Sequence, residues 1–343
     1  MKPRKIILFI SLTLFIIAAF CAWMLFGPAI QAPPGNFFYI HSGATYGQVK
    51  DSLKKNKIIG SDFWFDKVAN YVNYGRNVKA GKYRISEGMS VVNLVKMFRS
   101  GRQSPVNLII TKLRTKEDLA KKIGDNFETD SLSVINYLSN VDSILAFDVD
   151  TNNVMTIVIP NTYTYTWNTP ISKIFKKLYT EEQKFWNDER MKKTERLHLS
   201  PKEVYIVASL VEEETNHQED KGKIASVYIN RLRKGMKLAA DPTVKFAMKD
   251  FALKRIYYKY LSFPSPYNTY IHAGLPPGPI NTPSIKTIDA VLEAPETDYL
   301  FFVARSDFSG YSEFAATYQE HLINAKAYQQ ALDSMIKSRQ ENQ

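Results

Sequence analysis

Three consecutive glutamates, Glu212, Glu213 and Glu214, close a stretch whose other side chains are mostly apolar. With about 100° of rotation per residue and Val207 as the origin, Glu214 falls at about −20°, in the middle of an apolar stripe. Glu212 and Glu213 fall at about +140° and −120°, outside that stripe. A carboxyl group in apolar surroundings resists ionisation, which raises its pKa. An acid that keeps its proton near neutral pH can protonate a leaving oxygen, so the pattern indicates general acid catalysis by Glu214.

The element that must position Glu214 is a helix that begins at Ser200. Ser200 can cap the first turn, Pro201 suits the first helical position, and Glu203 completes a capping box. The apolar stripe predicts that this helix packs on a core along the face that carries Glu214. Glu214 also lies near the end of the helix, so a solvated charge at a frayed terminus is the alternative interpretation.

Residues 208–215 are the first of a series of motifs that follow one another in this part of the chain. The others are residues 224–232, Leu238 with residues 241–244, residues 267–270, and residues 274–280 with residues 282–284. Together they resemble the catalytic region of the MltG/YceG-like endolytic murein transglycosylases, and the resemblance covers essentially the whole chain. Residues 160–163 resemble the family's Pro-Asp-Thr-Tyr element, with Asn161 in place of the aspartate. Motifs in a fixed order are far more specific than one short motif.

The resemblance implies a bacterial cell-wall enzyme that acts inside nascent glycan strands. Family members cut peptidoglycan between MurNAc and GlcNAc and leave a 1,6-anhydroMurNAc end. The family's essential glutamate corresponds to Glu214, the residue that the helical periodicity selects. One carboxylate is sufficient because the C6 hydroxyl of the substrate attacks C1 intramolecularly, with a high effective molarity. Glu214 would protonate the glycosidic oxygen and then, as a carboxylate, accept the proton of the C6 hydroxyl.

Polar residues within the later motifs are candidate sugar contacts, because Asn, Tyr and Thr match sugar hydroxyls as donors and acceptors. They are Asn230, Asp241, Thr243, Tyr267, Asn268, Thr269 and Tyr270. The same residue types also build loops, so each has a structural alternative. Asn230 can hold the domain together, and Asp241 can cap the following helix. Asp241 can also be a second catalytic carboxylate, in which case a two-acid hydrolase returns as an option.

Other chemistries are excluded by the composition. The five histidines form no HExxH motif and no pair with ligand spacing on a helix, so no metal site is expected. Cys21 is the only cysteine and lies in an apolar run, which excludes a disulfide framework, a cysteine-based zinc site and a cysteine nucleophile. Neither a GxSxG element nor a P-loop occurs. We expect no cofactor.

The N-terminus predicts a membrane anchor. Residues 6–26 carry no charge, and about 20 apolar residues span a bilayer as a helix. Lys2, Arg4 and Lys5 precede this run, and no Lys or Arg follows it before Lys50. Because basic residues stay on the cytoplasmic side, we expect a single pass through the inner membrane, with the N-terminus inside and the bulk of the chain exported. A cleaved signal peptide is the alternative, but the run is too long and lacks a good cleavage site.

The remaining sequence predicts an α+β protein with a small module before a larger catalytic domain. We divide the chain into residues 1–27 (cytoplasmic tail and transmembrane anchor), 28–36 (linker), 37–106 (LysM-like module) and 107–343 (transglycosylase domain). A strand, a glycine turn and a capped helix occur twice in the module at an offset of 45 residues, pairing Thr45 with Ser90. In the larger domain we expect a strand over 157–163, a helical stretch over 171–195, and a helix from Ala315 that ends in a polar tail, residues 338–343.

The charge distribution restricts the partners. The chain carries a net charge of +11, and residues 1–110 hold 15 basic and 4 acidic residues, so the excess is at the front. A nucleic-acid-binding protein is therefore not expected. The LysM-like module of residues 37–106, called the front module below, is expected to be basic. We expect peptidoglycan strands and the inner membrane as partners, and the resemblance implies cell-wall synthases. The alternative function is a non-catalytic peptidoglycan-binding or scaffold protein of the synthesis machinery.

Overall fold

The computed structural model describes residues 3–253 and 255–341 and confirms a mixed fold of helices and short strands. The chain forms two units. The first comprises residues 1–108, 124–130 and 164–170, and the second comprises residues 109–123, 131–163 and 171–343. The expected Lys2 of the basic N-terminus and the last two residues of the expected polar tail lie outside the described residues.

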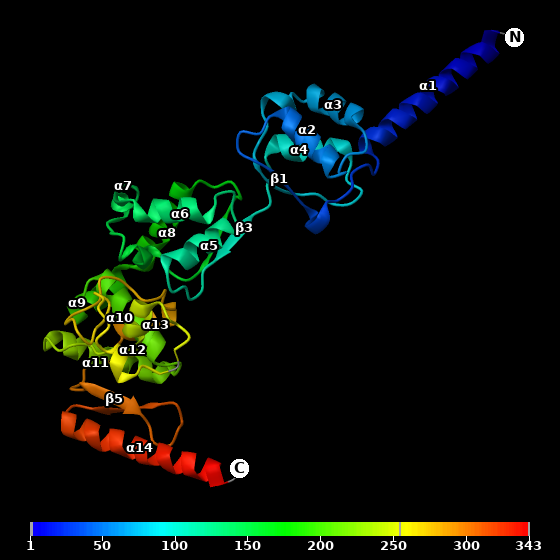
Figure 1. Cartoon of the computed structure of the whole chain (residues 1–343). Coiled ribbons are helices and arrows are strands. Elements are labelled where there is room, and N and C mark those ends of the chain that lie inside the picture. The colour runs from blue at the N-terminus through cyan, green and yellow to red at the C-terminus, as the bar shows by residue number, and fades with distance from the viewer. Residues whose placement is uncertain (1–2, 254, 342–343) are drawn as a thin grey trace. The chain divides into compact units, whose positions relative to one another are not determined.

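The first unit begins with helix α1 (Pro3–Phe26), which is long and apolar enough to cross a membrane (Figure 1). Its side chains from Ile6 to Phe20 are almost all exposed, as expected for a helix whose partner is lipid rather than protein. The chain then joins the front module without a free linker. The backbone N–H groups of Ala29 and Ile30 donate to the carbonyl of Met89, at 3.3 and 3.0 Å, and Ile30 is buried. The residues expected to form a linker over 28–36 thus include part of the module's core.

The front module consists of two strand–helix copies with further helical turns. Its elements are η1 (Pro34–Asn36), β1 (Phe37–Ile40), α2 (Tyr46–Lys55), α3 (Asp62–Tyr71), η2 (Tyr74–Arg76), β2 (Gly81–Arg84) and α4 (Val91–Ser100). Strands β1 and β2 pair antiparallel, with Phe37 opposite Arg84 and Ile40 opposite Gly81. The predicted repeat is confirmed, because Thr45 caps α2 and Ser90 caps α4.

The two copies close over one apolar core. The equivalent side chains Leu53 of α2 and Phe98 of α4 are fully buried in it. The aromatic residues between the copies divide between two environments: Phe65 and Tyr74 are fully buried, whereas Phe63 and Tyr71 are exposed. Only part of these aromatic residues therefore fill the core of the module.

Two later segments fold back onto the front module. In residues 124–130, Glu128 accepts hydrogen bonds from the backbone N–H and the hydroxyl of Ser42, at 2.7 and 2.6 Å. In residues 164–170, the ring of Trp167 contacts that of Tyr39 edge-on, with centroids 4.9 Å apart. The first unit is therefore assembled from chain segments that extend beyond residue 106.

The second sheet pairs β3 (Val106–Ile109) with β4 (Thr162–Tyr165), and the boundary between the units runs through both strands. The expected strand over 157–163 is wrong in position. Residues 154–157 form the 3-10 turn η4 (Val154–Ile157), and the strand begins only at Thr162. Residues 157–159 are apolar because they are buried, and burial in a turn imposes the same composition as burial in a strand. Helices α5 (Lys116–Gly124), α6 (Ser131–Ser139) and α7 (Val141–Ile144) and the turn η3 (Leu145–Phe147) lie between the strands.

The helical stretch expected over 171–195 is two helices, α8 (Ile171–Phe185) and α9 (Asp188–Leu197). Asn187 separates them, because its extended backbone and its side chain, which accepts from the N–H of Arg190, make it the N-cap of α9. A new cap inside a helical pattern starts a new helix. The charged surface pattern continues across the break, so periodicity alone does not reveal it.

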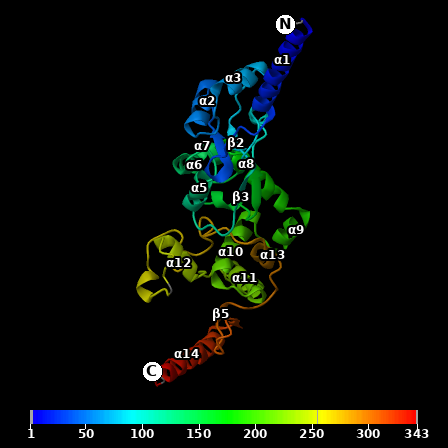
Figure 2. The ribbon, with the colours of Figure 1, turned by 90° about the vertical axis from the view of Figure 1, so that its right-hand side faces the viewer.

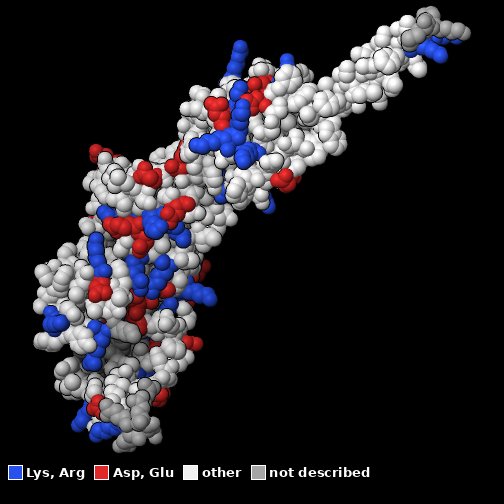
Figure 3. Space-filling view, turned by 45° about the vertical axis from the view of Figure 1, so that its right-hand side comes forward, with Lys and Arg blue, Asp and Glu red and all other residues white. Residues whose placement is uncertain are grey.

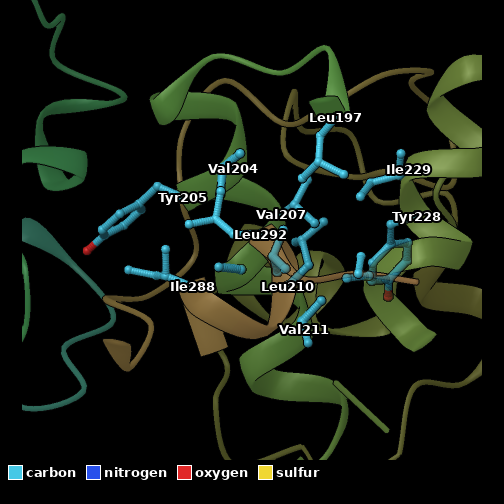
Figure 4. Packing of buried hydrophobic residues seen from close by; sticks show 14 of the residues in the cluster. Leu197, Val204, Tyr205, Val207, Leu210, Val211, Tyr228, Ile229, Ile288 and Leu292 are labelled. Atoms are coloured by element: carbon cyan, nitrogen blue, oxygen red, sulfur yellow. The ribbon is translucent and has the colours of Figure 1, made fainter. Parts of the chain in front are cut away.

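The core of the second unit is built by α10 (Pro201–Glu214), α11 (Gln218–Arg233) and α13 (Ile285–Leu292), which lie side by side (Figures 1 and 2). Val207 and Leu210 of α10 gather around Leu292 of α13, and Tyr228 of α11 closes the cluster (Figure 4). Helix α12 (Asp241–Met248) and the 3-10 turn η5 (Tyr258–Tyr260) belong to the connection between α11 and α13. The core thus holds α10 on the face that carries the apolar stripe.

The C-terminal part contains a hairpin that the sequence did not indicate. Strands β5 (Phe301–Ala304) and β6 (Ser312–Ala315) pair antiparallel, and helix α14 (Tyr318–Glu341) packs against them. The helix expected from Ala315 therefore starts three residues later, and Ala315 ends a strand. The helix also continues through Ser338 to Glu341, into the segment expected to be a polar tail.

Candidate active site

The predicted capping box of α10 is present. The side chain of Ser200 accepts from the N–H of Glu203 at 3.3 Å, and the Glu203 carboxylate accepts from the N–H of Ser200 at 2.7 Å. The helix runs to Glu214, with Thr215 as its C-cap. Every residue from Val204 to Val211 is buried. Glu214 is thus the last residue of a firmly packed helix rather than part of a frayed end.

Glu212 points toward the neighbouring helices. Its carboxylate accepts from the ammonium of Lys221 at 3.1 Å, from the hydroxyl of Ser284 at 3.1 Å and from the hydroxyl of Thr287. Burial acts to raise the pKa of Glu212, but the hydrogen bond from Thr287 and the charge of Lys221 outweigh it and hold the pKa below its usual value. Glu212 therefore stays ionised and ties α10 to α11 and α13.

Glu213 faces a different set of cations. Its carboxylate lies 2.7 Å from the ammonium of Lys112 and 3.9 Å from the guanidinium of Arg114, both from the segment before α5. The side-chain amide of Asn281 donates to the same carboxylate at 3.2 Å. These partners suit a structural ion pair that joins α10 to two connecting segments.

Unlike Glu212 and Glu213, Glu214 forms no ion pair with any residue that the structure describes, and it is only partly buried. Burial of its carboxyl group, against which the hydrogen bond from Tyr228 acts only in part, raises the pKa to about 7. The phenol of Tyr228 donates to Oε1 of Glu214 at 2.5 Å. An acid with this pKa, still accessible from one side, fits a group that gives and takes a proton near neutral pH.

Three further groups act on the Glu214 carboxyl through their charge. The negative charge of Asp241 raises its pKa, whereas the positive charges of Lys245 and Arg231 lower it. The phenol of Tyr270 belongs to the same cluster and donates to Oδ1 of Asp241 at 2.6 Å. Of the candidate sugar contacts, Asp241 and Tyr270 are thus placed beside Glu214, one exposed and the other partly buried.

Thr243, Asn268 and Thr269 are buried and hydrogen-bonded within the protein. The hydroxyl of Thr243 donates to the carbonyl of Ala240 at 2.7 Å and lies 2.9 Å from the hydroxyl of Thr269. The amide of Asn268 donates to the carbonyls of residues 261 and 263, both at 2.9 Å. These three side chains fix the loops on either side of α12 through these hydrogen bonds.

Asn230 and Tyr267 also contact protein groups. The amide of Asn230 donates to the carbonyls of Thr297 and Tyr299, at 2.7 and 3.0 Å. The ring of Tyr267 packs against Phe246, with centroids 4.8 Å apart, and its hydroxyl donates to the carbonyl of Asn152 at 3.4 Å. Each matches the structural alternative that the sequence left open.

The glycine- and proline-rich motif before α13 serves as a scaffold for α10. The backbone N–H of Ile280 donates to the hydroxyl of Ser209 at 3.1 Å, and the amide of Asn281 donates to the Ser209 carbonyl at 2.8 Å. A β-carbon at Gly278 would approach the carbonyl oxygen of Asn152 within 2.1 Å, so only glycine fits there. Asn161, which replaces the family's aspartate, accepts from the N–H of Thr162 and of Ile110.

A small cavity of about 60 Å³ lies next to Lys245, one of the charged groups that act on Glu214. Lys245 lines it together with Glu213, Arg114, Phe246, Phe251, Pro242 and Ile280. The guanidinium of Arg114 lies 4.8 Å from the centre of the Phe251 ring, so the cavity has a cationic wall backed by an aromatic one.

Three of the residues that act on the Glu214 carboxyl were not predicted from the sequence as part of the site: Tyr228, Arg231 and Lys245. A signal existed for Tyr228, because it lies four residues after Ile224 and shares its buried face, where a phenol needs a partner. Across residues 3–253 and 255–341, no group of three or more His, Cys, Asp or Glu side chains is arranged to hold a metal ion.

Comparisons with known proteins identify the family of this chain. A model of the YceG-like family matches residues 38–327. An endolytic murein transglycosylase of Bacillus subtilis (strain 168) is 32% identical over 303 residues, which are 82% of this chain and 81% of the relative. One of Streptococcus pneumoniae serotype 2 is 26% identical over 299 residues, 77% of this chain and 53% of the relative. This chain therefore spans about half the length of the pneumococcal protein. A crystal structure of a YceG-like protein from Listeria monocytogenes matches with a TM-score of 0.54 and 27% identity, over 83% of this chain and 97% of that one.

Proposed function

The chain belongs to the YceG-like family, and from this premise we propose that it is an endolytic murein lytic transglycosylase whose general acid and base is Glu214. The observation that carries the assignment is the carboxyl of Glu214, which has a pKa of about 7 and accepts a hydrogen bond from Tyr228. The curated relatives named endolytic murein transglycosylases support the activity. The substrate is the glycan strand of peptidoglycan, cut between MurNAc and GlcNAc.

The proposed reaction uses the two protonation states of Glu214 in turn. The neutral acid protonates the glycosidic oxygen, and the C6 hydroxyl of MurNAc attacks C1 as that bond breaks. The Glu214 carboxylate then accepts the proton of the C6 hydroxyl, which closes the 1,6-anhydro ring and restores the acid. The hydrogen bond from Tyr228 and the charges of Arg231 and Lys245 stabilise the carboxylate between these steps. Asp241 has the opposite effect, because its negative charge raises the pKa of Glu214 and favours the protonated acid before the reaction.

We propose Asp241 and Tyr270 as the sugar-contacting groups next to Glu214. Both lie in the cluster, and Asp241 is exposed, so its second oxygen can accept from a sugar hydroxyl. Asn230, Thr243, Tyr267, Asn268 and Thr269 support the pocket through the contacts described above. Their partners are backbone carbonyls and each other, as expected for the walls of a site.

We further propose that α1 is an uncleaved anchor in the cytoplasmic membrane and that the two units face the peptidoglycan. The supporting observations are an exposed apolar helix at the N-terminus, the basic residues Arg4 and Lys5 in its first turn, and no Lys or Arg directly after it. On this basis residues 37–106 form a LysM-like module that follows the anchor along the chain and precedes the catalytic domain. Cell-wall synthases are the proposed protein partners.

Digestion of intact sacculi by the full-length protein, followed by mass spectrometry of the released muropeptides, tests the function. Wild-type protein is expected to produce 1,6-anhydroMurNAc ends, and Glu214→Gln is expected to produce none, since the amide cannot donate the proton. Glu213→Gln is the matched control, because Glu213 is held by Lys112 and Asn281 and lies outside the proposed chemistry.

The same digest separates the alternatives. A two-acid hydrolase that uses Asp241 would give reducing ends instead of anhydro ends. A scaffold protein would bind sacculi and release no product from wild type. Either result would contradict the assignment of Glu214 as a transglycosylase acid.

A further inference from the structure

The front module has an apolar cavity of about 530 Å³ where α1 meets α3 and α4. Phe26 at the end of α1 lines it, together with Phe63, Trp64 and Tyr71 of α3. Tyr71 is 89% exposed and Phe63 is 57% exposed, so large aromatic surface remains in contact with solvent. Phe63 and Tyr71 therefore lie outside the core of the module.

Two of these aromatic residues share one face of α3 with a lysine. Phe63, Lys67 and Tyr71 are spaced four residues apart and therefore lie one above the other on the helix. The ring of Trp64 contacts that of Phe63 edge-on, with centroids 5.1 Å apart, and the ammonium of Lys67 lies 5.4 Å from the centre of the Phe63 ring. Aromatic rings interleaved with lysine are the composition of a membrane–water interface.

The chain geometry fixes the depth of this face. Helix α1 has 24 residues and is about 36 Å long, enough to cross a hydrocarbon core of about 30 Å. Trp23 and Phe26, both exposed, lie at its C-terminal end, where aromatic residues mark the interface. From Phe26 to Ala29, which is already hydrogen-bonded to the module, the chain spans at most about 11 Å. With α1 across the membrane as proposed, this short connection keeps the module next to the membrane surface.

The charges around the cavity match phospholipid. Lys67 and Lys96 line it and are exposed. Figure 3 shows that Lys and Arg gather on the front module, whereas the shaft of α1 is free of charge up to the basic residues near its N-terminal end. Long lysine side chains can place their stems along an apolar surface and their ammonium groups among phosphates.

We propose that this aromatic and basic face of α3 and α4 docks onto the outer surface of the membrane that α1 crosses, with an acyl chain in the cavity and anionic phospholipid headgroups at Lys67 and Lys96. The inference rests on the proposed anchoring by α1 and adds a second, peripheral contact to it. The contact fixes the orientation of the front module on the bilayer, because one helix alone would leave it free to rotate.

The full-length protein in phosphatidylglycerol nanodiscs tests the docking. A bimane fluorophore is attached to a single cysteine, and quenching is measured with lipids that carry a nitroxide on the acyl chain. The native Cys21 reports on α1, whereas Tyr71→Cys and Phe63→Cys, each with Cys21→Ser, report on the cavity face. Arg84→Cys with Cys21→Ser is the matched control, at an exposed position outside the cavity.

We expect the fluorophore at Tyr71→Cys and Phe63→Cys to be quenched to an extent comparable to that at Cys21, and the one at Arg84→Cys to be little quenched. Quenching at Cys21 with none at Tyr71→Cys would overturn the docking and leave the anchor intact. A second copy of the chain covering the face would give that same result, since it brings no lipid nitroxide. No quenching at Cys21 would overturn the anchor itself.

A charge-reversal variant tests the headgroup contact. Lys67→Glu combined with Lys96→Glu is expected to reduce quenching at Tyr71→Cys and to leave quenching at Cys21 unchanged. Replacing phosphatidylglycerol by phosphatidylcholine should have the same selective effect on the unreversed protein. Equal quenching in all of these samples would contradict a role for anionic headgroups.

Discussion

Three adjacent residues of one type serve three different purposes because their neighbours differ. Hydrogen bonds and the charge of Lys221 keep Glu212 ionised, and Glu213 is paired with two cations. The carboxyl of Glu214 is desolvated by burial and lies near the phenol of Tyr228 and the charges of Asp241, Lys245 and Arg231. The pKa of each carboxyl is a property of its surroundings, so the residue type alone does not identify a catalytic acid.

The pH dependence of kcat/KM is expected to respond to the neighbours of Glu214. Activity should fall as the pH rises through about 7, because the neutral acid is required. Tyr228→Phe removes a hydrogen bond that favours the carboxylate, so the decline should move to higher pH. Asp241→Asn removes a negative charge and should move it to lower pH. Release of anhydro-muropeptides, measured from pH 5 to 9, checks both directions.

Tyr83→Phe is the control for these shifts, because it removes a phenol hydrogen bond to Lys79 in the front module and leaves Glu214 untouched. Shifts of the same sign in Tyr228→Phe and Asp241→Asn would contradict the electrostatic account of the cluster.

Stability should also depend on the ionisation of Glu214. Its pKa is raised on folding from 4.5 to about 7, so the contribution of the neutral acid is fully present below pH 4.5 and is lost as the pH rises through 7. The side chain of Glu214→Gln is neutral at every pH. The free energy of unfolding of this variant, relative to that of wild type, should therefore be higher at pH 8 than at pH 5. The change is at most about 3 kcal/mol, from about 1.4 kcal/mol per pH unit. Urea unfolding at both pH values measures it, and an equal difference at pH 5 and pH 8 would contradict the raised pKa.

At the scale of elements, helix α10 is held in place by connections far away in the sequence. Residues 280–281 bond to Ser209, and Lys221 of α11, whose side chain is only 8% exposed, bonds to Glu212. Because α10 ends at Glu214, any shift of these supports displaces the carboxyl group. The glycine- and proline-rich motif thus supports the site through its contacts with α10.

Gly278→Ala is therefore expected to destabilise the second unit. The new β-carbon would meet the carbonyl oxygen of Asn152, a backbone atom that cannot move away cheaply. Overpacking of this kind costs about 1–3 kcal/mol. Thermal unfolding measures the loss, and Gly47→Ala in α2, where a β-carbon meets nothing within 4 Å, is the control. Equal melting temperatures for the two variants would show that the Asn152 backbone adjusts.

At the scale of the whole molecule, the charge and the apolar surface are distributed unevenly. The net charge of +11 lies at the front of the chain, next to an apolar helix whose side chains are exposed. Exposed apolar surface on this scale is typical of a segment that contacts lipid, which agrees with the anchor proposed above.

The full-length protein is expected to remain in the membrane fraction through high-salt and alkaline washes. Leu14→Arg combined with Ile17→Arg should release it, because each charge near the centre of a span costs about 2.5–3.5 kcal/mol. Leu14→Ile combined with Ile17→Leu is the volume-matched control. Immunoblots of pellet and supernatant check the result, and retention of the Arg variant would contradict a bilayer-spanning α1.

Local features allowed a large part of this fold to be predicted from the sequence. Caps at Thr45, Ser90 and Ser200, the repeat of 45 residues and the apolar run of α1 depend on neighbours within a few residues, and the structure confirms them. Buried apolar runs were less informative. The strand expected over 157–163 begins only at Thr162, and the β5–β6 hairpin was not predicted. A buried turn and a buried strand have the same composition, and hairpin pairing depends on contacts made across the fold.

The candidate site divides in the same way. By itself, the sequence determined that Glu214 shares the apolar face of its helix, because the rotation per residue is fixed by local backbone geometry. Only the tertiary structure decided that Tyr228, Arg231, Asp241 and Lys245 surround this carboxyl, and that Thr243, Asn268 and Thr269 are bonded inside the protein. Those contacts join residues on different helices and loops. Their distances depend on how the helices pack, which no local pattern specifies.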